Sequence, residues 1–307
     1  IGNSKHAYQA FKSDNLELHV SMDHFLTPTG ALADYVLPAT DALERVHLTH
    51  MWGVLGNQWY GREAAIDPEY ERKDDYQLWC DLGKRLGQAE FWPDTLEGWL
   101  DRILSPAGVT LKEFAQKPGY APPSKYKRYE EKGFGTFSGK VELVPSILTR
   151  LGYDPLEGYQ EPPWSPVATP ELAKDYPLIL ISGSRVRQFH HSSHRQIAKL
   201  RKKYPHPLLQ INPQTAADLG IAEGDSVYIE TPLGRVTQKA QLLEEMHPSV
   251  VHADGYWWYP EKPEAEPSLF GVWESNIDSI VPNDPEVCDY VGNNYFRGLL
   301  CRVYKAE

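Results

Sequence analysis

The sequence predicts a mixed α/β chain in which a partial open α/β sheet domain is followed by a compact β-barrel domain. In residues 16–38 a strand, a loop, a helix and a second strand follow one another, which is the order of an open α/β sheet. In residues 178–242 an apolar strand, a short helix and a hairpin follow one another, which favours a barrel. With 307 residues, the chain is long enough to bury two cores.

The first domain is predicted to span residues 1–157. Alternating side chains indicate a strand, whereas leucines at every fourth position after an Asp pair indicate a helix that begins with an N-cap. The expected elements are a short helix around 7–12, a strand at 16–21, a helix after Thr29, a strand at 35–38, and helices at 74–87, 95–104 and 111–116.

A linker at residues 158–175 is predicted next, because prolines gather in Glu161-Pro-Pro-Trp-Ser-Pro. The barrel domain then covers residues 176–307. Asn212 before Pro213 is an N-cap signal, and Gly220 ends that helix. The segments on either side of the turn at 232–235 alternate as two strands, which completes the hairpin.

A loop rich in hydrogen-bond donors follows the apolar strand at 178–181. Small residues allow a ligand to approach closely, and hydroxyls, imidazoles and guanidiniums supply directional hydrogen bonds. The candidate binding residues in this loop are Ser182, Gly183, Arg185, His191, Ser192, Ser193 and His194. A polar loop of this kind at the end of a strand predicts a ligand cradle.

Three polar residues of the first domain, Asn3, Ser21 and Asp23, fall at the expected ends of strands or turns. In an open α/β sheet, ligands bind at such ends. The same residue types also cap helices and form turns. From spacing alone the two interpretations stay equally open.

Composition excludes some classes of protein. A net charge of −11 disfavours a nucleic-acid surface. No apolar run approaches the ~20 residues needed to span a membrane. The chain starts without Met, so a removed leader would leave no trace, and the compartment stays open between cytoplasm and periplasm, soluble or peripheral to a membrane complex. The three cysteines are far apart, which favours buried free thiols.

Several motifs resemble the dimethyl sulfoxide reductase family of molybdopterin oxidoreductases. The barrel motifs are Ile181-Ser-Gly-Ser-Arg-Val, Phe189-His-His-Ser-Ser-His-Arg and the segment 211–225. The segment Asp23 to Thr40 is similar to the signature of the family's third domain. The resemblance covers the whole chain but only the C-terminal portion of the usual family chain, and it implies that the barrel is a double-psi β-barrel. The segment 133–143 would supply a turn and a strand that return to the sheet.

The resemblance also implies a cofactor, namely two molybdopterin guanine dinucleotides per full enzyme carrying molybdenum or tungsten. Asp23 would bind a guanine, which suits a carboxylate that accepts two N–H bonds. Arg45 would keep a positive charge near a phosphate, although relatives often carry Lys there. Counterparts of Asn3, Ser21, Asp75, Asn276 and Arg297 would also contact the cofactor. Asp74 is the alternative to Asp75.

The chain lacks a Cys cluster for an iron–sulfur centre and a recognisable protein ligand for molybdenum or tungsten. The expected partners are therefore an N-terminal half or a separate Cys-rich catalytic chain, together with an iron–sulfur electron-transfer subunit. The implied activity is two-electron redox chemistry, as in anaerobic respiration, on a small substrate such as formate, a sulfur oxyanion or polysulfide. The branch most similar contains polysulfide or thiosulfate reductases, formate dehydrogenases and acetylene hydratase. This chain alone is expected to be inactive.

Three other hypotheses compete with this one. His190, His191 and His194 could form a zinc site, but neighbouring imidazoles in a loop rarely converge. The chain could instead be an orphan, non-catalytic module that binds a pterin or nucleotide. The many Trp and Tyr residues could bind carbohydrate, although a core and wrapped coil explain them equally well.

Overall fold

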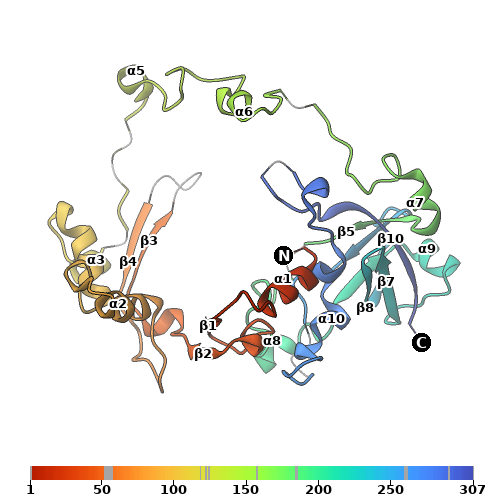
Figure 1. Ribbon diagram of the computed structural model, residues 1–307, viewed down its shortest axis with the longest axis horizontal. Helices are drawn as coiled ribbons and strands as arrows, with labels where there is room; N and C mark the ends of the chain where they lie inside the picture. The colour runs from red at the N-terminus through yellow and green to blue at the C-terminus, as the bar shows by residue number, and fades with distance from the viewer. Residues whose placement is uncertain are drawn as a thin grey trace. The chain divides into compact units, whose positions relative to one another are not determined.

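The computed structural model describes residues 2–51, 58–117, 119–121, 123, 125–156, 158–183, 186–258, 262–289 and 291–306 (Figure 1). In chain order the helices longer than a single 3₁₀ turn are α1 (Ser4–Phe11), α2 (Asp75–Arg85), α3 (Leu96–Leu104), α4 (Leu111–Ala115), α5 (Tyr129–Lys132), α6 (Ser146–Arg150), α7 (Pro170–Asp175), α8 (Ala198–Arg201), α9 (Pro213–Asp218), α10 (Val272–Ser275) and the four-residue 3₁₀ helix η7 (Ile277–Ile280). The strands are β1 (Val20–Asp23), β2 (Tyr35–Pro38), β3 (His47–Met51), β4 (Gln58–Arg62), β5 (Leu178–Ile181), β6 (Leu208–Ile211), β7 (Ser226–Thr231), β8 (Gly234–Leu242), β9 (Val250–Ala253) and β10 (Arg297–Lys305).

The chain divides into two compact units. Unit 1 comprises residues 1–21, 25–35 and 159–307, and unit 2 comprises residues 22–24 and 36–158. The N-terminal segment therefore groups with the barrel, whereas the sequence placed it with residues 36–157. The cause is long-range contact, because Asn3 N–H donates to the Val281 carbonyl at 2.5 Å and Tyr8 packs edge-on against Trp273. Periodicity along the chain carries no information about such contacts.

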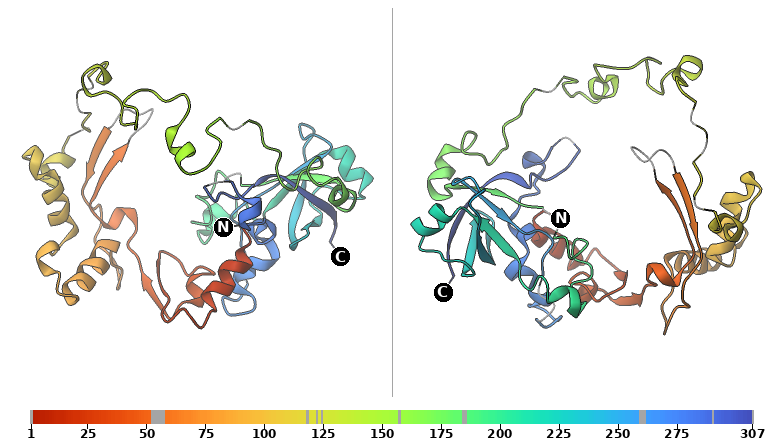
Figure 2. Two further views of the ribbon diagram at one scale, coloured as in Figure 1. Left: turned by 45° about the horizontal axis from the view of Figure 1, so that its top comes forward. Right: turned by 180° about the vertical axis from the view of Figure 1, so that it is seen from behind.

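Unit 1 is built on a closed six-stranded barrel in the order β10-β5-β9-β6-β8-β7. Figure 2 draws its strands in two further orientations. The pairs β5–β9 and β6–β8 are parallel, and the other pairs are antiparallel. This confirms the predicted mixed α/β fold with a β-barrel. Closure leaves no strand edge of the barrel unpaired, so its backbone groups satisfy one another.

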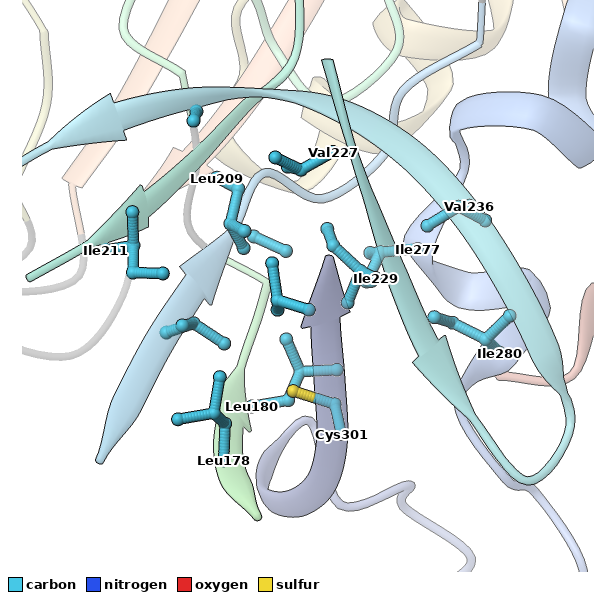
Figure 3. Packing of buried hydrophobic residues seen from close by; sticks show 14 of the residues in the cluster. Leu178, Leu180, Leu209, Ile211, Val227, Ile229, Val236, Ile277, Ile280 and Cys301 are labelled. Carbon is cyan, nitrogen blue, oxygen red and sulfur yellow. The ribbon is translucent and has the colours of Figure 1, made fainter. Parts of the chain in front are cut away.

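The barrel core follows from alternation along each strand. In β7, Val227 and Ile229 are fully buried, while Ser226, Tyr228 and Glu230 between them are only partly covered. Figure 3 shows these side chains converging with those of Leu209, Ile211 and Val236. Ile277 and Ile280 of η7 join the same cluster. Burial of apolar surface at about 25 cal/mol per Å² makes this core the main stabilising feature of unit 1.

Unit 2 contains the antiparallel ribbon β3–β4 with short helices packed against it. Val46, Leu48 and Trp59 contact a buried cluster formed by α3 and α4, namely Leu100, Leu104, Leu111 and Phe114. Side-chain caps start the helices: Asp74 accepts from Gln77 N–H, Thr95 from Gly98 N–H, and Thr110 forms a capping box with Glu113. The helices predicted at 74–87, 95–104 and 111–116 are confirmed.

Some local predictions were wrong in extent. The helix expected around 7–12 begins earlier, at Ser4, and the helix expected after Thr29 is a 3₁₀ turn at Gly30–Leu32. The strand expected at 16–21 is the shorter β1. The turn at 133–143 forms, but no strand follows it. A strand needs a partner for its backbone groups, and no strand within the described ranges pairs with this segment.

The Glu142 carboxylate holds this segment through hydrogen bonds to residues on both sides of it in the chain. Its carboxylate accepts from Ser146 N–H at 3.0 Å, from Ser146 Oγ–H, and from Ser138 N–H at 3.2 Å. These bonds lower the pKa of Glu142 from its ordinary 4.5 to about 2. Because the folded pKa is depressed, the stabilisation of α6 is present above pH 4.5 and is lost as the pH falls through about 2.

We therefore expect the Glu142 carboxyl carbon to titrate near pH 2 in an NMR experiment. The control is Glu142→Gln, which should remove this resonance and leave other carboxylates unchanged. Titration close to 4.5 would contradict the hydrogen-bonded arrangement.

None of the helices described here combines the length and apolar character required to cross a membrane.

Candidate functional site

The polar loop after β5 meets two other strand ends. Ser182 donates from its backbone N–H to the Phe296 carbonyl at 2.7 Å, and its hydroxyl donates to the same oxygen at 3.3 Å. Gly183 has a φ of 84°, a left-handed conformation that favours glycine. A Cβ on Gly255 would lie 3.2 Å from the Gly183 Cα, so the chain has little room for a side chain at position 255. The ends of β5 and β9 and the start of β10 thus converge on one glycine-lined point.

The register of the strands brings Arg297 to the same place. Arg297 on β10 lies opposite Ile181 on β5, which in turn lies beside His252 on β9. Arg297 itself is exposed. The barrel therefore joins candidate residues Ser182, Gly183 and Arg297, although more than 110 residues separate them in the chain.

The histidine loop is held in a tight turn. Ser193 N–H donates to the His190 carbonyl at 2.9 Å, and His191 and His194 have φ values of 55° and 73°. The rings of His190 and His191 stack at 4.7 Å, and His191 stacks on Tyr256 at 4.4 Å. Ser192 is half-buried and Ser193 exposed. Arg185, also a candidate, lies outside the described residues.

Arg195 fixes this loop and was missed at the sequence level. Its side chain is fully buried, donates to the carbonyls of Gly255 and Tyr256, and lies over the Trp257 ring at 4.1 Å. Burial lowers the pKa of Arg195 to about 9, which still leaves the guanidinium charged at neutral pH. An Arg in a polar loop normally indicates solvent exposure, so the sequence carried no signal for this role.

His252 was also missed. Its neighbours Val251 and Ala253 point into the barrel core, so alternation turns His252 to the outer face. It is nevertheless buried, and both ring nitrogens lack a hydrogen-bond partner. Burial lowers the pKa of His252 and keeps the imidazole neutral. An unpartnered buried imidazole beside Ile181 and across one strand from Arg297 is a site where a ligand could supply the missing hydrogen bonds.

A second buried polar group, Asp254, stabilises the histidine loop. Asp254 accepts from Tyr204 O–H and from Leu208 N–H, each at 2.8 Å. Burial raises the pKa of Asp254 above its ordinary value, and burial likewise raises the pKa of Tyr204. Tyr204 also packs with Phe189 and Trp257, so the Asp254–Tyr204 pair anchors the segment that carries the histidines.

Asn3 and Asn276 lie close together in unit 1. Asn276 Nδ2 donates to the hydroxyl of Ser4, the residue after Asn3, at 3.3 Å. Asn276 also caps η7 by accepting from Asp278 N–H, and Asn3 is buried with a left-handed φ of 45°. Ser21 lies elsewhere, on β1 beside Gly30.

The remaining candidates belong to unit 2. Asp23 ends β1 and accepts from His24 N–H at 2.7 Å. Arg45 and Asp75 form an ion pair, with Nη1 and Oδ2 3.3 Å apart. Asp74 is occupied as the N-cap of α2, which leaves Asp75 as the carboxylate available for other contacts. A cavity of about 550 Å³ beside this pair is lined by Ala42, Arg45, His47, Thr49, Tyr60, Gly61 and Arg62.

Metal ligation finds no support in the described part of the chain. No group of three His, Cys, Asp or Glu residues there is arranged to hold an ion. His190 and His191 lie with their rings parallel instead of converging on a point. Cys80 and Cys301 are buried free thiols, as predicted, and Cys288 is half-buried.

Comparison with known proteins identifies relatives of the whole chain. The Molydopterin dinucleotide binding domain matches residues 178–297. Acetylene hydratase of Syntrophotalea acetylenica is 39% identical over 95% of this chain and 40% of the relative. Dopamine dehydroxylase of Eggerthella lenta is 34% identical over 99% of this chain and 37% of the relative. Trimethylamine-N-oxide reductase of Haemophilus influenzae is 29% identical over 76% of this chain and 32% of the relative.

A solved structure agrees with these sequence matches. Acetylene hydratase from Pelobacter acetylenicus superposes with a TM-score of 0.93 at 32% identity, covering 99% of this chain and 42% of that chain. The chain thus spans about two fifths of the length of these relatives. It belongs to the dimethyl sulfoxide reductase family of molybdopterin enzymes, corresponds to the C-terminal portion of its members, and carries their molybdopterin dinucleotide-binding domain.

Proposed function

We propose that this chain binds and orients two molybdopterin guanine dinucleotides that carry molybdenum or tungsten. The observation that carries the proposal is the convergence of Ser182–Gly183, Gly255 and Arg297 at one end of the barrel. The absence of a side chain on Gly255 lets the Gly183 backbone pass close beside it, so the polar loop and the start of β10 meet at this end of the barrel. The surrounding hydroxyl, guanidinium and imidazole groups suit the polar atoms of a pterin and its phosphates.

Each residue has a distinct task in this proposal. Arg297 would pair with a phosphate, because a guanidinium donates two parallel bonds to such oxygens. His252, as a neutral imidazole, would gain a hydrogen-bond partner from the pterin ring system. The flat stack of His191 on Tyr256 would support a planar ring. Arg185, Ser192, Ser193, His194, Asn3 and Asn276 would complete the binding set in unit 1, together with Ser21, while Asp23, Arg45 and Asp75 would act from unit 2.

The bound group supplies two-electron redox chemistry at its metal. For the complete enzyme we propose a small substrate such as formate, polysulfide or a sulfur oxyanion. Similarity to a thiosulfate reductase subunit of Salmonella typhimurium, 26% identical over 78% of this chain, supports the sulfur class. The similarity to acetylene hydratase favours a second candidate, in which the same cofactor serves a hydration of acetylene.

Catalysis in this proposal requires polypeptide beyond the present chain. An N-terminal half or a separate Cys-rich chain would supply the metal's protein ligand, and an iron–sulfur subunit would deliver electrons. The coverage of about two fifths of the relatives supports this requirement. An assay of the complete native enzyme with a viologen dye and thiosulfate, and in parallel with acetylene, separates redox chemistry from hydration.

Substitution of Arg297 tests the cofactor proposal. Loss of a charge-assisted bond to phosphate costs about 1.5–3 kcal/mol, so Arg297→Gln should weaken cofactor retention about tenfold or more. The measurement is molybdenum or tungsten and released guanine per polypeptide in the purified complete enzyme. Arg302→Gln is the matched control, because Arg302 lies on the same strand but pairs with Glu230 at 2.6 Å. Equal cofactor content in both variants would refute the role of Arg297.

A further inference from the structure

The segment 134–156 of unit 2 exposes a run of large apolar side chains. Every residue in the segment is at least partly exposed, and none belongs to a buried cluster of the described chain. Single exposed apolar residues are ordinary on a protein surface, whereas a run of them marks an interaction site. Leu143 is 85% exposed, and the run also includes Phe137, Val141, Val144, Ile147, Leu151 and Leu156.

Polar contacts within the segment hold it in shape. The Glu142 carboxylate accepts from the backbone N–H groups of Ser138 and Ser146, which lie on either side of it in the chain. The Arg150 guanidinium lies 3.7 Å from the centroid of the Phe137 ring, so α6 is joined to the turn that precedes it. The polar groups of the segment thus contact one another while its apolar side chains are exposed, which is the reverse of a surface adapted to water.

The segment also lacks the neighbours that its sequence pattern requires. Residues 140–143 alternate as a strand, yet no strand forms, because no strand of the described ranges pairs with them. Ile147 and Leu151 lie one turn apart at α6 and so share a face, and both are exposed. The described part of unit 2 therefore leaves this apolar face uncovered.

The length of a solved relative indicates what covers the segment. Acetylene hydratase from Pelobacter acetylenicus superposes over 99% of this chain, which leaves no gap large enough to omit residues 134–156. This chain covers only 42% of that protein, so more than half of its polypeptide lies outside the shared part. The shared fold therefore includes the exposed segment in a protein that has further polypeptide available to pack against it.

We propose that segment 134–156 is the docking surface for the polypeptide that corresponds to the N-terminal part of these relatives. The inference rests on the proposed function, which requires such polypeptide, and it adds where on this chain that polypeptide packs. The partner face would be apolar, because the two basic and two acidic residues of the segment balance in charge. Burial of apolar surface, and not charge attraction, would drive the association.

The accessibility of position 143 in the complete enzyme tests the proposal. The variant Leu143→Cys is labelled with a maleimide in the isolated 307-residue chain and in the complete enzyme, and mass spectrometry follows the peptide that contains this position. We expect labelling at least about tenfold slower in the complete enzyme, because a packed apolar interface excludes water and reagent. Lys112→Cys is the matched control, since Lys112 is exposed on α4 of the same unit, and it should be labelled at similar rates in both proteins.

Insertion of a charge gives a second readout. Val141→Asp and Leu143→Asp should leave the melting temperature of the isolated chain unchanged, because both side chains are exposed there. The same variants should lower the melting temperature of the complete enzyme by several degrees, because a carboxylate would be buried in an apolar interface. Lys112→Asp should change neither melting temperature.

Equal labelling of position 143 in the two proteins would overturn the proposal, as would equal protection of positions 143 and 112. Protection that increases with the concentration of the isolated chain would assign the surface to a second copy of this chain, and a chain that purifies from its source without further polypeptide would likewise exclude the proposed occupant. Cofactor content is a separate readout. A complete enzyme that retains its guanine dinucleotide but is labelled freely at position 143 refutes the docking surface alone, whereas one that holds no cofactor refutes the proposed function.

Discussion

Truncation of Leu180 to alanine should lower the free energy of unfolding of the barrel by about 3 kcal/mol, within the range measured for buried Leu to Ala changes. Leu180 is fully buried at the centre of β5 and belongs to the core cluster shown in Figure 3. Its loss removes both the transfer free energy of the side chain and the contacts that its neighbours make across the barrel. A closed barrel has little freedom to collapse onto the resulting cavity.

The measurement is urea unfolding of the full chain, followed by amide hydrogen exchange of the barrel strands, so that the two units are observed separately. Leu143→Ala is the matched control, because Leu143 is 85% exposed in unit 2. It should change the stability of either unit by less than about 0.5 kcal/mol. A Leu180 variant as stable as this control would show that β5 does not contribute to the barrel core as described.

Replacement of Arg195 by alanine should have an effect of similar size and a second, functional consequence. The change leaves the carbonyls of Gly255 and Tyr256 without their donor and opens a cavity against Trp257. We expect a loss of about 3 kcal/mol from these two causes together. Because Arg195 holds the backbone of Tyr256, the stack of Tyr256 on His191 should loosen, and cofactor retention by the complete enzyme should fall with it.

The variant Arg195→Met separates the free-energy cost of the cavity from the cost of the lost hydrogen bonds. Methionine fills most of the cavity but still leaves the two carbonyls unpaired, so its cost should be smaller, about 1–3 kcal/mol. Arg187→Ala is the control, because Arg187 is exposed in the same segment and should unfold like the unaltered chain. Urea unfolding monitored by tryptophan fluorescence gives the stabilities. An Arg195→Ala variant with unchanged stability and unchanged cofactor content would contradict the role assigned to this guanidinium.

The sequence was sufficient for several elements whose structure depends on near neighbours in the chain. Alternation in Ser226–Thr231 placed β7, and the Asn212–Pro213 pair placed the start of α9. Caps at Asp74, Thr95 and Thr110 likewise lie where helices begin. These features follow from local sterics and local hydrogen bonds, which a short stretch of sequence specifies completely.

The candidate site was predictable only in part. Ser182 and Gly183 were recognisable because a strand ends there, and Arg297 was recognisable through the family resemblance. Arg195 and His252 gave no signal, since a buried Arg in a loop and a buried His on the outer face of a barrel depend on what covers them. The strand expected after residue 139 failed for the related reason that alternation cannot supply a partner strand.

By itself, therefore, the sequence determined the class of fold, the helices α2, α3, α4 and α9, the strands β5, β7 and β8, and the polar loop that follows β5. Tertiary structure alone decided that residues 1–21 join the barrel, that Arg62 and Arg45 share a cavity, and that Gly183 meets Gly255. The physical reason is the separation along the chain over which each effect acts. Periodicity and capping act over a few residues, whereas burial and strand register bring together groups that lie far apart in the chain.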